Sequence, residues 1–111
     1  MAEEGTPEAV LELLDGYTCA ILSAASSRPV SAKSIREAFG VPDSTLYRRL
    51  PRLVERGLLT ERTRIDDDGN HYRVYESRIE RVVFEVADGT ATARVSTADD
   101  DRTRVETWRF D

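Results

Sequence analysis

One segment of this chain, residues 44–56, combines arginines with hydroxyl side chains at the spacing of a helix. Projected at about 100° per residue, its leucines form one apolar stripe. Thr45 and Arg48 lie opposite this stripe, whereas Arg49 lies on its flank. An arginine can donate two hydrogen bonds to O6 and N7 of guanine, and a hydroxyl can bond to a base edge or a phosphate. We therefore predict a helix that binds in the major groove of DNA, with candidate contacts Ser44, Thr45, Tyr47, Arg48, Arg49 and Arg52.

A second group of arginines lies in two alternating segments on either side of an acidic turn. Arg62 and Arg64 precede the turn and Arg73 follows it, so that all three could reach phosphates or the minor groove. The turn itself carries three carboxylates in residues 66–68, which the phosphates of DNA would repel. We therefore expect these arginines to bind DNA near the base of the hairpin rather than at its tip. We interpret His71, beside the turn, as a surface residue.

The charge of the chain changes sign along the sequence. The whole chain carries 21 acidic and 16 basic residues, and the bases are fifteen arginines and one lysine. Residues 28–64 have a net charge of +5, whereas residues 1–27 and residues 65–111 each have a net charge of −5. A basic segment in an acidic chain often marks an anion-binding surface. The excess of acids with almost no lysine is typical of adaptation to high salt, although a coding bias also favours arginine over lysine.

The candidate residues follow a series of predicted helices. Thr6, Pro7 and Glu8 have the residue types that begin a helix, and Asp15 with Gly16 divides that helix from an apolar one over residues 17–26.

Two shorter helices follow. Ser31 is the predicted N-cap of a helix over residues 32–39, which ends at Gly40 and buries Ile35, Ala38 and Phe39. Asp43 is the predicted cap of the arginine-bearing helix, and Gly57 ends it.

After Gly57 the pattern changes to the alternation that is typical of strands. Residues 58–65 and 71–79 form a predicted hairpin, residues 81–86 and 90–95 form a second, and residues 103–110 form a final strand.

Pro51 interrupts the arginine-bearing helix. It has no amide to bond to the carbonyl of Tyr47, and it should kink the helix or end it near Leu50. An end at Leu50 would place Arg52 and Arg56 outside the helix. We favour a bend, because Leu50, Leu53 and Val54 continue the apolar stripe.

Several classes of protein are excluded. No apolar run is long enough to span a bilayer, and the acidic N-terminus does not have the pattern of a secretory signal. We interpret Cys19, the single cysteine, as a small buried side chain rather than a redox sensor. The sequence has no Cys/His cluster at metal-site spacing, no pairing of a nucleophile with a base, and no phosphate-binding glycine loop. We expect a cytoplasmic protein that is not an enzyme and has no metal or cofactor.

The order of these elements resembles the winged helix-turn-helix. The resemblance rests on residues 31–39 as first helix, residues 40–43 as turn, residues 44–56 as recognition helix and residues 58–75 as wing, about half of the chain. More narrowly, the chain is similar to the ArsR-like transcriptional regulators of halophilic archaea. The resemblance implies an α+β fold, with N-terminal helices, a β-hairpin wing and further C-terminal antiparallel strands. It does not extend to metal sensing, because the paired ligands of the metal-sensing relatives are absent.

We assign residues 1–78 to the DNA-binding domain and residues 79–111 to a C-terminal β extension. Small winged-helix regulators usually bind two half-sites as dimers. The first helix, the C-terminal strands or both could form a homodimer interface anchored by Phe84, Trp108 or Phe110, and packing of the strands beneath the helices of one chain is the alternative.

The sequence thus predicts a sequence-specific regulator of transcription, a repressor, whose partner is double-stranded DNA. The alternative is a winged-helix module that binds other proteins in a transcription or replication complex. The sequence identifies no small-molecule effector.

Overall fold

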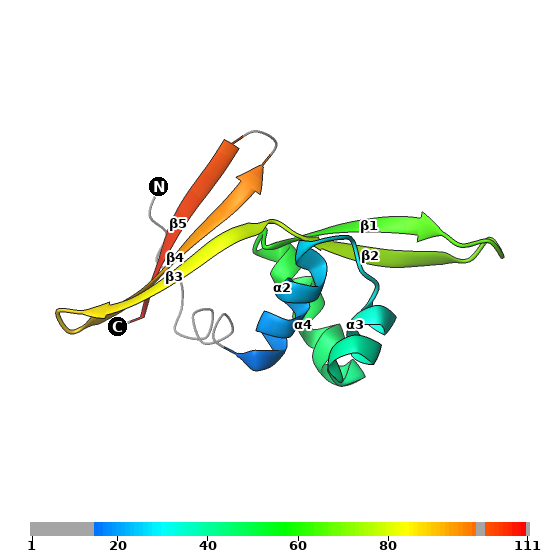
Figure 1. Cartoon of the computed structure of the whole chain (residues 1–111), viewed down its shortest axis with the longest axis horizontal. Helices are drawn as coiled ribbons and strands as arrows, with labels where there is room; N and C mark the ends of the chain where they lie inside the picture. Colours follow the sequence, from blue (N-terminus) through cyan, green and yellow to red (C-terminus); the bar gives the residue numbers. More distant parts are fainter. Residues whose placement is uncertain (1–14, 100–101, 111) are drawn as a thin grey trace. The chain divides into compact units, whose positions relative to one another are not determined.

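The computed structural model describes residues 15–99 and 102–110, with side chains up to residue 98 (Figure 1). The helix predicted to begin at Thr6 lies outside the described residues. The described chain forms three helices and five strands: α2 (Gly16–Ser26), α3 (Ala32–Phe39), α4 (Asp43–Glu55), β1 (Leu59–Ile65), β2 (His71–Ser77), β3 (Ile79–Ala87), β4 (Thr90–Asp99) and β5 (Arg102–Phe110). The chain divides into two compact units, of which one is Gly16–Arg78 and the other contains β3, β4 and β5.

The core of the Gly16–Arg78 unit is made by the apolar stripes of its helices and the base of its hairpin. The predicted stripe of α4 is confirmed at Leu46, Leu50 and Leu53, which are almost completely buried, whereas Val54 is half-buried. The other buried apolar side chains of this unit are Ile21, Ala25, Val30, Ile35, Val41, Leu58, Leu59, Val74 and Tyr75. Each helix therefore buries one side in a common core, and its other side is left to contact solvent or a ligand.

Helix α3 has the two ends that the sequence predicts. The Ser31 hydroxyl accepts a hydrogen bond from the amide of Ser34 at 3.1 Å, and Gly40 ends the helix with a φ of 67°. Its predicted buried face is only partly right: Ile35 is buried, but Ala38 and Phe39 are exposed.

Helix α4 begins one residue earlier than predicted, and Asp43 is not its N-cap. The N-cap is Pro42, which has an extended backbone and no side-chain cap. Asp43 is the first helical residue, and its carboxylate accepts two hydrogen bonds from Nη1 of Arg36, at 2.9 and 3.0 Å. These bonds raise the pKa of Arg36. They join α3 to the start of α4 across the turn.

The C-terminus of α4 has the form of a Schellman motif. Gly57, with a φ of 76°, donates to the carbonyl of Val54 at 3.0 Å, and Leu58 donates to the carbonyl of Leu53 at 2.9 Å. The helix runs through Pro51 to Glu55, so the alternative that it ends near Leu50 is wrong.

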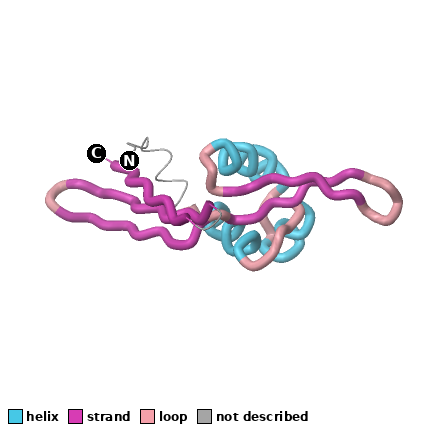
Figure 2. The backbone as a smooth tube through the Cα atoms, turned by 90° about the horizontal axis from the view of Figure 1, so that it is seen from above, coloured by secondary structure: helices cyan, strands magenta, loops and turns pink. Residues whose placement is uncertain are grey.

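The segment before α3 is joined to the hairpin of β1 and β2. Val30 and Tyr75 exchange two backbone hydrogen bonds, at 2.9 and 2.7 Å. Because Ser31 follows Val30 directly, this pairing places the start of α3 beside β2. Figure 2 shows the two strands extending from the helices to the loop at the end of the hairpin.

The other unit contains an antiparallel sheet in the strand order β3-β4-β5. Both the second predicted hairpin and the final strand are therefore confirmed. Val82 pairs with Val95, Phe84 with Ala93, and Val86 with Ala91. Since paired residues share a face, these six apolar residues lie on one face of the sheet.

Candidate nucleic-acid interface

One side of α4 is open to solvent. We define the exposed face of α4 as Ser44, Tyr47, Arg48, Pro51, Arg52 and Glu55, all of which are exposed. Tyr47, its aromatic member, has 76% of its surface accessible. Arg48 makes no ion pair with any residue that the structure describes. This face can therefore present a hydroxyl, a phenol and two guanidinium groups to a ligand.

Two of the candidate contacts are turned toward the protein instead. Thr45 is only 8% exposed, so its predicted position opposite the buried stripe is wrong. Arg49, one helical turn later, is half-buried, and its Nη1 donates to Oγ1 of Thr18 in α2 at 3.0 Å. Its guanidinium carbon also lies 5.9 Å from the ring centre of Tyr17. In this structure Arg49 holds α4 against α2.

Replacing Arg49 by alanine should therefore lower stability, because it removes the bond to the buried Thr18 hydroxyl. We expect a loss of about 1 to 3 kcal/mol in the free energy of unfolding, measured by chemical denaturation. The matched control is Arg48→Ala, on the same helix and exposed, which should change stability by less than about 0.5 kcal/mol. Equal effects of the two substitutions would contradict the role of Arg49 between the helices.

The three arginines of the hairpin do not share a face. Arg62 pairs with Val74 and Arg64 with Tyr72, whereas Arg73 pairs with Thr63. Because side chains alternate along a strand, Arg62 and Arg64 lie on one face and Arg73 lies on the other.

Acidic neighbours partly compensate the positive charge of two of these arginines. Arg62 lies 3.7 Å from Glu76, and Arg73 lies 3.7 Å from Glu61. Arg64 is exposed and makes no ion pair within the part of the chain that the structure describes. It is therefore the hairpin arginine most available to a phosphate.

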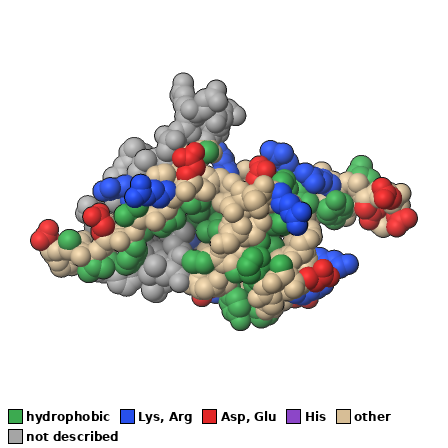
Figure 3. Space-filling view, viewed as in Figure 1, with side chains coloured by type: hydrophobic (Ala, Val, Ile, Leu, Met, Phe, Trp, Pro, Cys, Tyr) green, Lys and Arg blue, Asp and Glu red, His purple; other side chains and the backbone are tan. Residues whose placement is uncertain are grey.

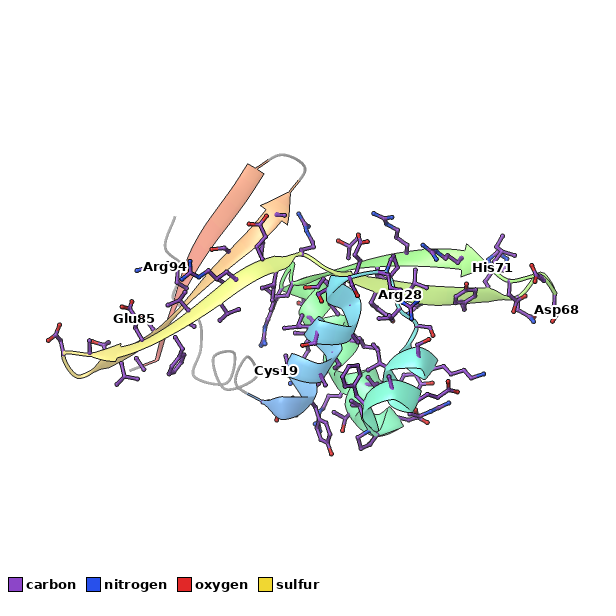
Figure 4. All side chains as sticks on the ribbon, viewed as in Figure 1. Cys19, Arg28, Asp68, His71, Glu85 and Arg94 are labelled. Atoms are coloured by element: carbon purple, nitrogen blue, oxygen red, sulfur yellow. The ribbon has the colours of Figure 1, made fainter. Side chains whose placement is uncertain are left out.

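The tip of the hairpin is built around one carboxylate. Oδ1 of Asp66 accepts hydrogen bonds from the amides of Asp68 at 2.9 Å and Asn70 at 2.8 Å, and Gly69 supplies a φ of 81°. The tip is acidic, with basic side chains farther back along the hairpin (Figure 3). Asp68 lies at the tip, beyond His71, which is exposed as the sequence predicts (Figure 4). The acids shape the turn, and they leave the strands as the better surface for an anion.

A hollow lies beside this surface, and it brings together residues that the sequence does not connect. Tyr47 from α4 and Arg73 from β2 border it, and so does Lys33 from the first turn of α3. Lys33 is not among the predicted contacts. The sequence signal for Lys33 is its position two residues after the N-cap Ser31. The N-terminus of a helix attracts anions, and a basic side chain there adds to this attraction.

The arrangement defines the class of the protein. Three helices, with a turn between α3 and α4, are followed by a β-hairpin and further antiparallel strands, which is an α+β winged helix-turn-helix. Residues 9–62 match a family model described as a helix-turn-helix domain. No curated protein and no solved structure matches the chain. The match supports a regulator of the helix-turn-helix type and, with it, DNA as the partner and transcription regulation as the role.

The Cys19 side chain corrects one expectation. The sequence interpretation places it in the core, but the residue is exposed on α2 (Figure 4). The core positions of α2 are Thr18, Ile21 and Ala25.

Among the described residues, no helix is long and apolar enough to cross a membrane.

Proposed function

We propose that this chain is a sequence-specific DNA-binding repressor of transcription that inserts α4 into the major groove. The observation that carries the proposal is the exposed face of α4. It belongs to the second helix of the helix-turn-helix, lies in the basic segment of an acidic chain, and presents Arg48 with no ion pair among the described residues. In this fold the second helix contacts base edges through its N-terminal part. Repression is proposed because a small domain bound at a promoter can exclude other proteins.

The candidate contacts have different roles in this proposal. Arg48 and Arg52 donate to base edges, and Ser44 at the start of α4 binds a base edge or a phosphate. Arg64, exposed in the hairpin, binds a phosphate beside the groove.

The other five candidates act less directly or not at all on the DNA. Tyr47 contacts the DNA backbone from the flank of α4. Arg62 and Arg73 reach phosphates only if they leave their glutamate neighbours, and Thr45 and Arg49 support α4 from the protein side.

The narrower resemblance to ArsR-like regulators of halophilic archaea is part of the proposal. It is supported by a net charge of −5 with a single lysine. At molar salt the Debye length is roughly 3 Å, and phosphate contacts lose much of their affinity. A regulator in such a cell depends on direct contacts to bases, and a few exposed arginines in an acidic protein suit that demand.

The proposal includes a homodimer formed through the sheet. Val82, Phe84 and Val86 are exposed on β3, and they share one face with the register positions of Trp108 and Phe110 on β5. Ala93 and Val95, on β4 in the middle of the same face, are buried within the chain, so the open part of this face is its β3 edge. An exposed apolar edge of this kind is suited to bind a second copy. The β-strand extension, residues 79–111, is thus proposed as the dimerisation element.

Selection of bound duplexes from a random library tests both parts of the proposal. We expect one enriched motif made of two inverted half-sites, about 10 to 10.5 base pairs apart from centre to centre or a multiple of that distance. Light scattering in high salt should give the mass of two chains. The absence of any enriched motif would contradict sequence-specific binding and favour a protein-interaction module. A single half-site with a monomer mass would contradict the dimer alone.

A further inference from the structure

The hollow between α3, α4 and β2 has a volume of about 350 Å³. Its floor is part of the core, because Leu46, Leu50 and Tyr75 are buried. Its open side is bordered by Tyr47, which is exposed, and by Tyr72. The paired backbones of Val30 and Tyr75 fix the distance between α3 and β2. The shape of the hollow is therefore set by packed side chains and backbone bonds.

The charge of the hollow is entirely of one sign. Lys33 and Arg73 border it, and none of the residues that line it is acidic. Glu61, which lies 3.7 Å from Arg73, is not among them. The hollow also opens at the start of α3, where the helix dipole favours negative charge. Charge complementarity therefore favours an anion, which would compete with Glu61 for Arg73.

The walls select an aromatic group. Tyr47 and Tyr75 line the hollow together with Pro51, and Tyr72 also borders it, although alternation places Tyr72 on the other face of β2 from Tyr75. Stacked or edge-to-face contacts with these rings favour a flat aromatic partner. The volume is at the lower end of the range of small-molecule sites, about 300 to 1,000 Å³. It is more than large enough for a ligand with one aromatic ring.

We propose that this hollow is a binding site for a small aromatic carboxylate, whose ring lies among the tyrosines and whose carboxylate lies between Lys33 and Arg73. Tyr47 belongs to the exposed face of α4, so a bound ligand occupies space next to the DNA. The ligand therefore weakens DNA binding and acts as an inducer. This second step rests on the proposed function, whereas binding of the carboxylate does not.

Benzoate is the probe, added to the full chain without DNA and followed by backbone amide NMR. We expect saturable shifts at residues 31–33, 47 and 71–75, with a Kd on the order of 1 mM for a ligand of this size. Benzamidine, which has the same ring and the opposite charge, should bind much more weakly, and so should acetate, which has no ring.

Two substitutions test the site. Arg73→Ala and Tyr47→Ala both change exposed residues and should leave the chain folded. Each should weaken benzoate binding by about 3- to 10-fold. The control is Arg94→Ala, which removes the same charge from β4, where Arg94 lies 3.8 Å from Glu85, and which should leave the Kd of benzoate unchanged.

Three results would overturn the site. These are the absence of saturable shifts with benzoate, equal binding of benzamidine, and unchanged affinity in both variants. If the same resonances shift with a short duplex but not with benzoate, the hollow binds the DNA backbone and the proposal is wrong.

The inducer step is tested separately with DNA. Benzoate at ten times its Kd should lower the affinity for the selected duplex by about tenfold, as expected for competition at one site. If benzoate binds and DNA affinity does not change, the inducer step is wrong and the site stands. If the chain binds no DNA, the proposed function fails, and the NMR titration still decides the site.

Discussion

Replacing Arg48 and Arg52 together by alanine should abolish specific retardation of the selected duplex in a gel. Each bidentate contact between arginine and guanine contributes about 1 to 3 kcal/mol of discrimination. Loss of two such contacts therefore lowers specific affinity by about 30-fold to more than 1,000-fold. Both residues are exposed on α4, so thermal unfolding of the variant should be close to that of the original chain.

The control for this prediction removes two charges elsewhere. Arg81→Ala with Arg94→Ala changes two exposed arginines that lie on one face of the sheet, and it should preserve the preference for the selected duplex. Random duplexes separate base contacts from phosphate contacts. If the Arg48 and Arg52 substitutions weaken binding to selected and random duplexes equally, these arginines bind phosphates. If binding is unchanged, α4 does not enter the groove through this face.

The net charge of the basic segment overstates the number of cations available to DNA. Of the nine bases in residues 28–64, Arg36 bonds to Asp43, Arg49 bonds to Thr18, and Arg62 lies beside Glu76. Arg48 and Arg64 are exposed without an ion pair in the described part of the chain. The salt dependence of DNA binding should therefore reflect fewer phosphate contacts than the sequence count implies.

The sequence was sufficient for features that depend on one element alone. The spacing of Leu46, Leu50 and Leu53 predicts the buried side of α4, and Gly57 predicts its end, because both follow from helix geometry and glycine's freedom at positive φ. The alternation in the hairpin likewise predicts the strands and the acidic turn. These parts of the fold were predicted correctly.

Features that depend on a second element were predicted less well. A helical projection gives the angle of Thr45 and Arg49 relative to Leu46, but it does not show that α2 lies against that flank. For the same reason Cys19 and Phe39 were placed in the core, although both are exposed. An apolar residue on a short helix is buried only where a neighbouring element covers it. The sequence alone therefore could not separate the exposed candidate residues from those that support α4, because this distinction depends on how α2 packs against α4.

Replacing Leu53 by alanine should give one of the largest losses of stability among single substitutions in α4. Leu53 is almost fully buried, as are Leu46 and Leu50 on the same stripe. Truncation leaves a cavity in the core of the Gly16–Arg78 unit. Such substitutions cost about 2 to 5 kcal/mol, a large part of the total of about 5 to 15 kcal/mol for a small domain.

Chemical denaturation measures this loss, with Glu55→Ala as the control on the same helix. Glu55 is exposed, so its replacement should change stability by less than about 0.5 kcal/mol. A loss below about 1 kcal/mol for Leu53→Ala would contradict its packing in the core. Under conditions where the variant is still folded, it should keep the preference for the selected duplex over random DNA, because Leu53 lies on the side of α4 away from the exposed face. This separates Leu53 from Arg48 and Arg52, whose replacement should remove the preference and leave stability almost unchanged.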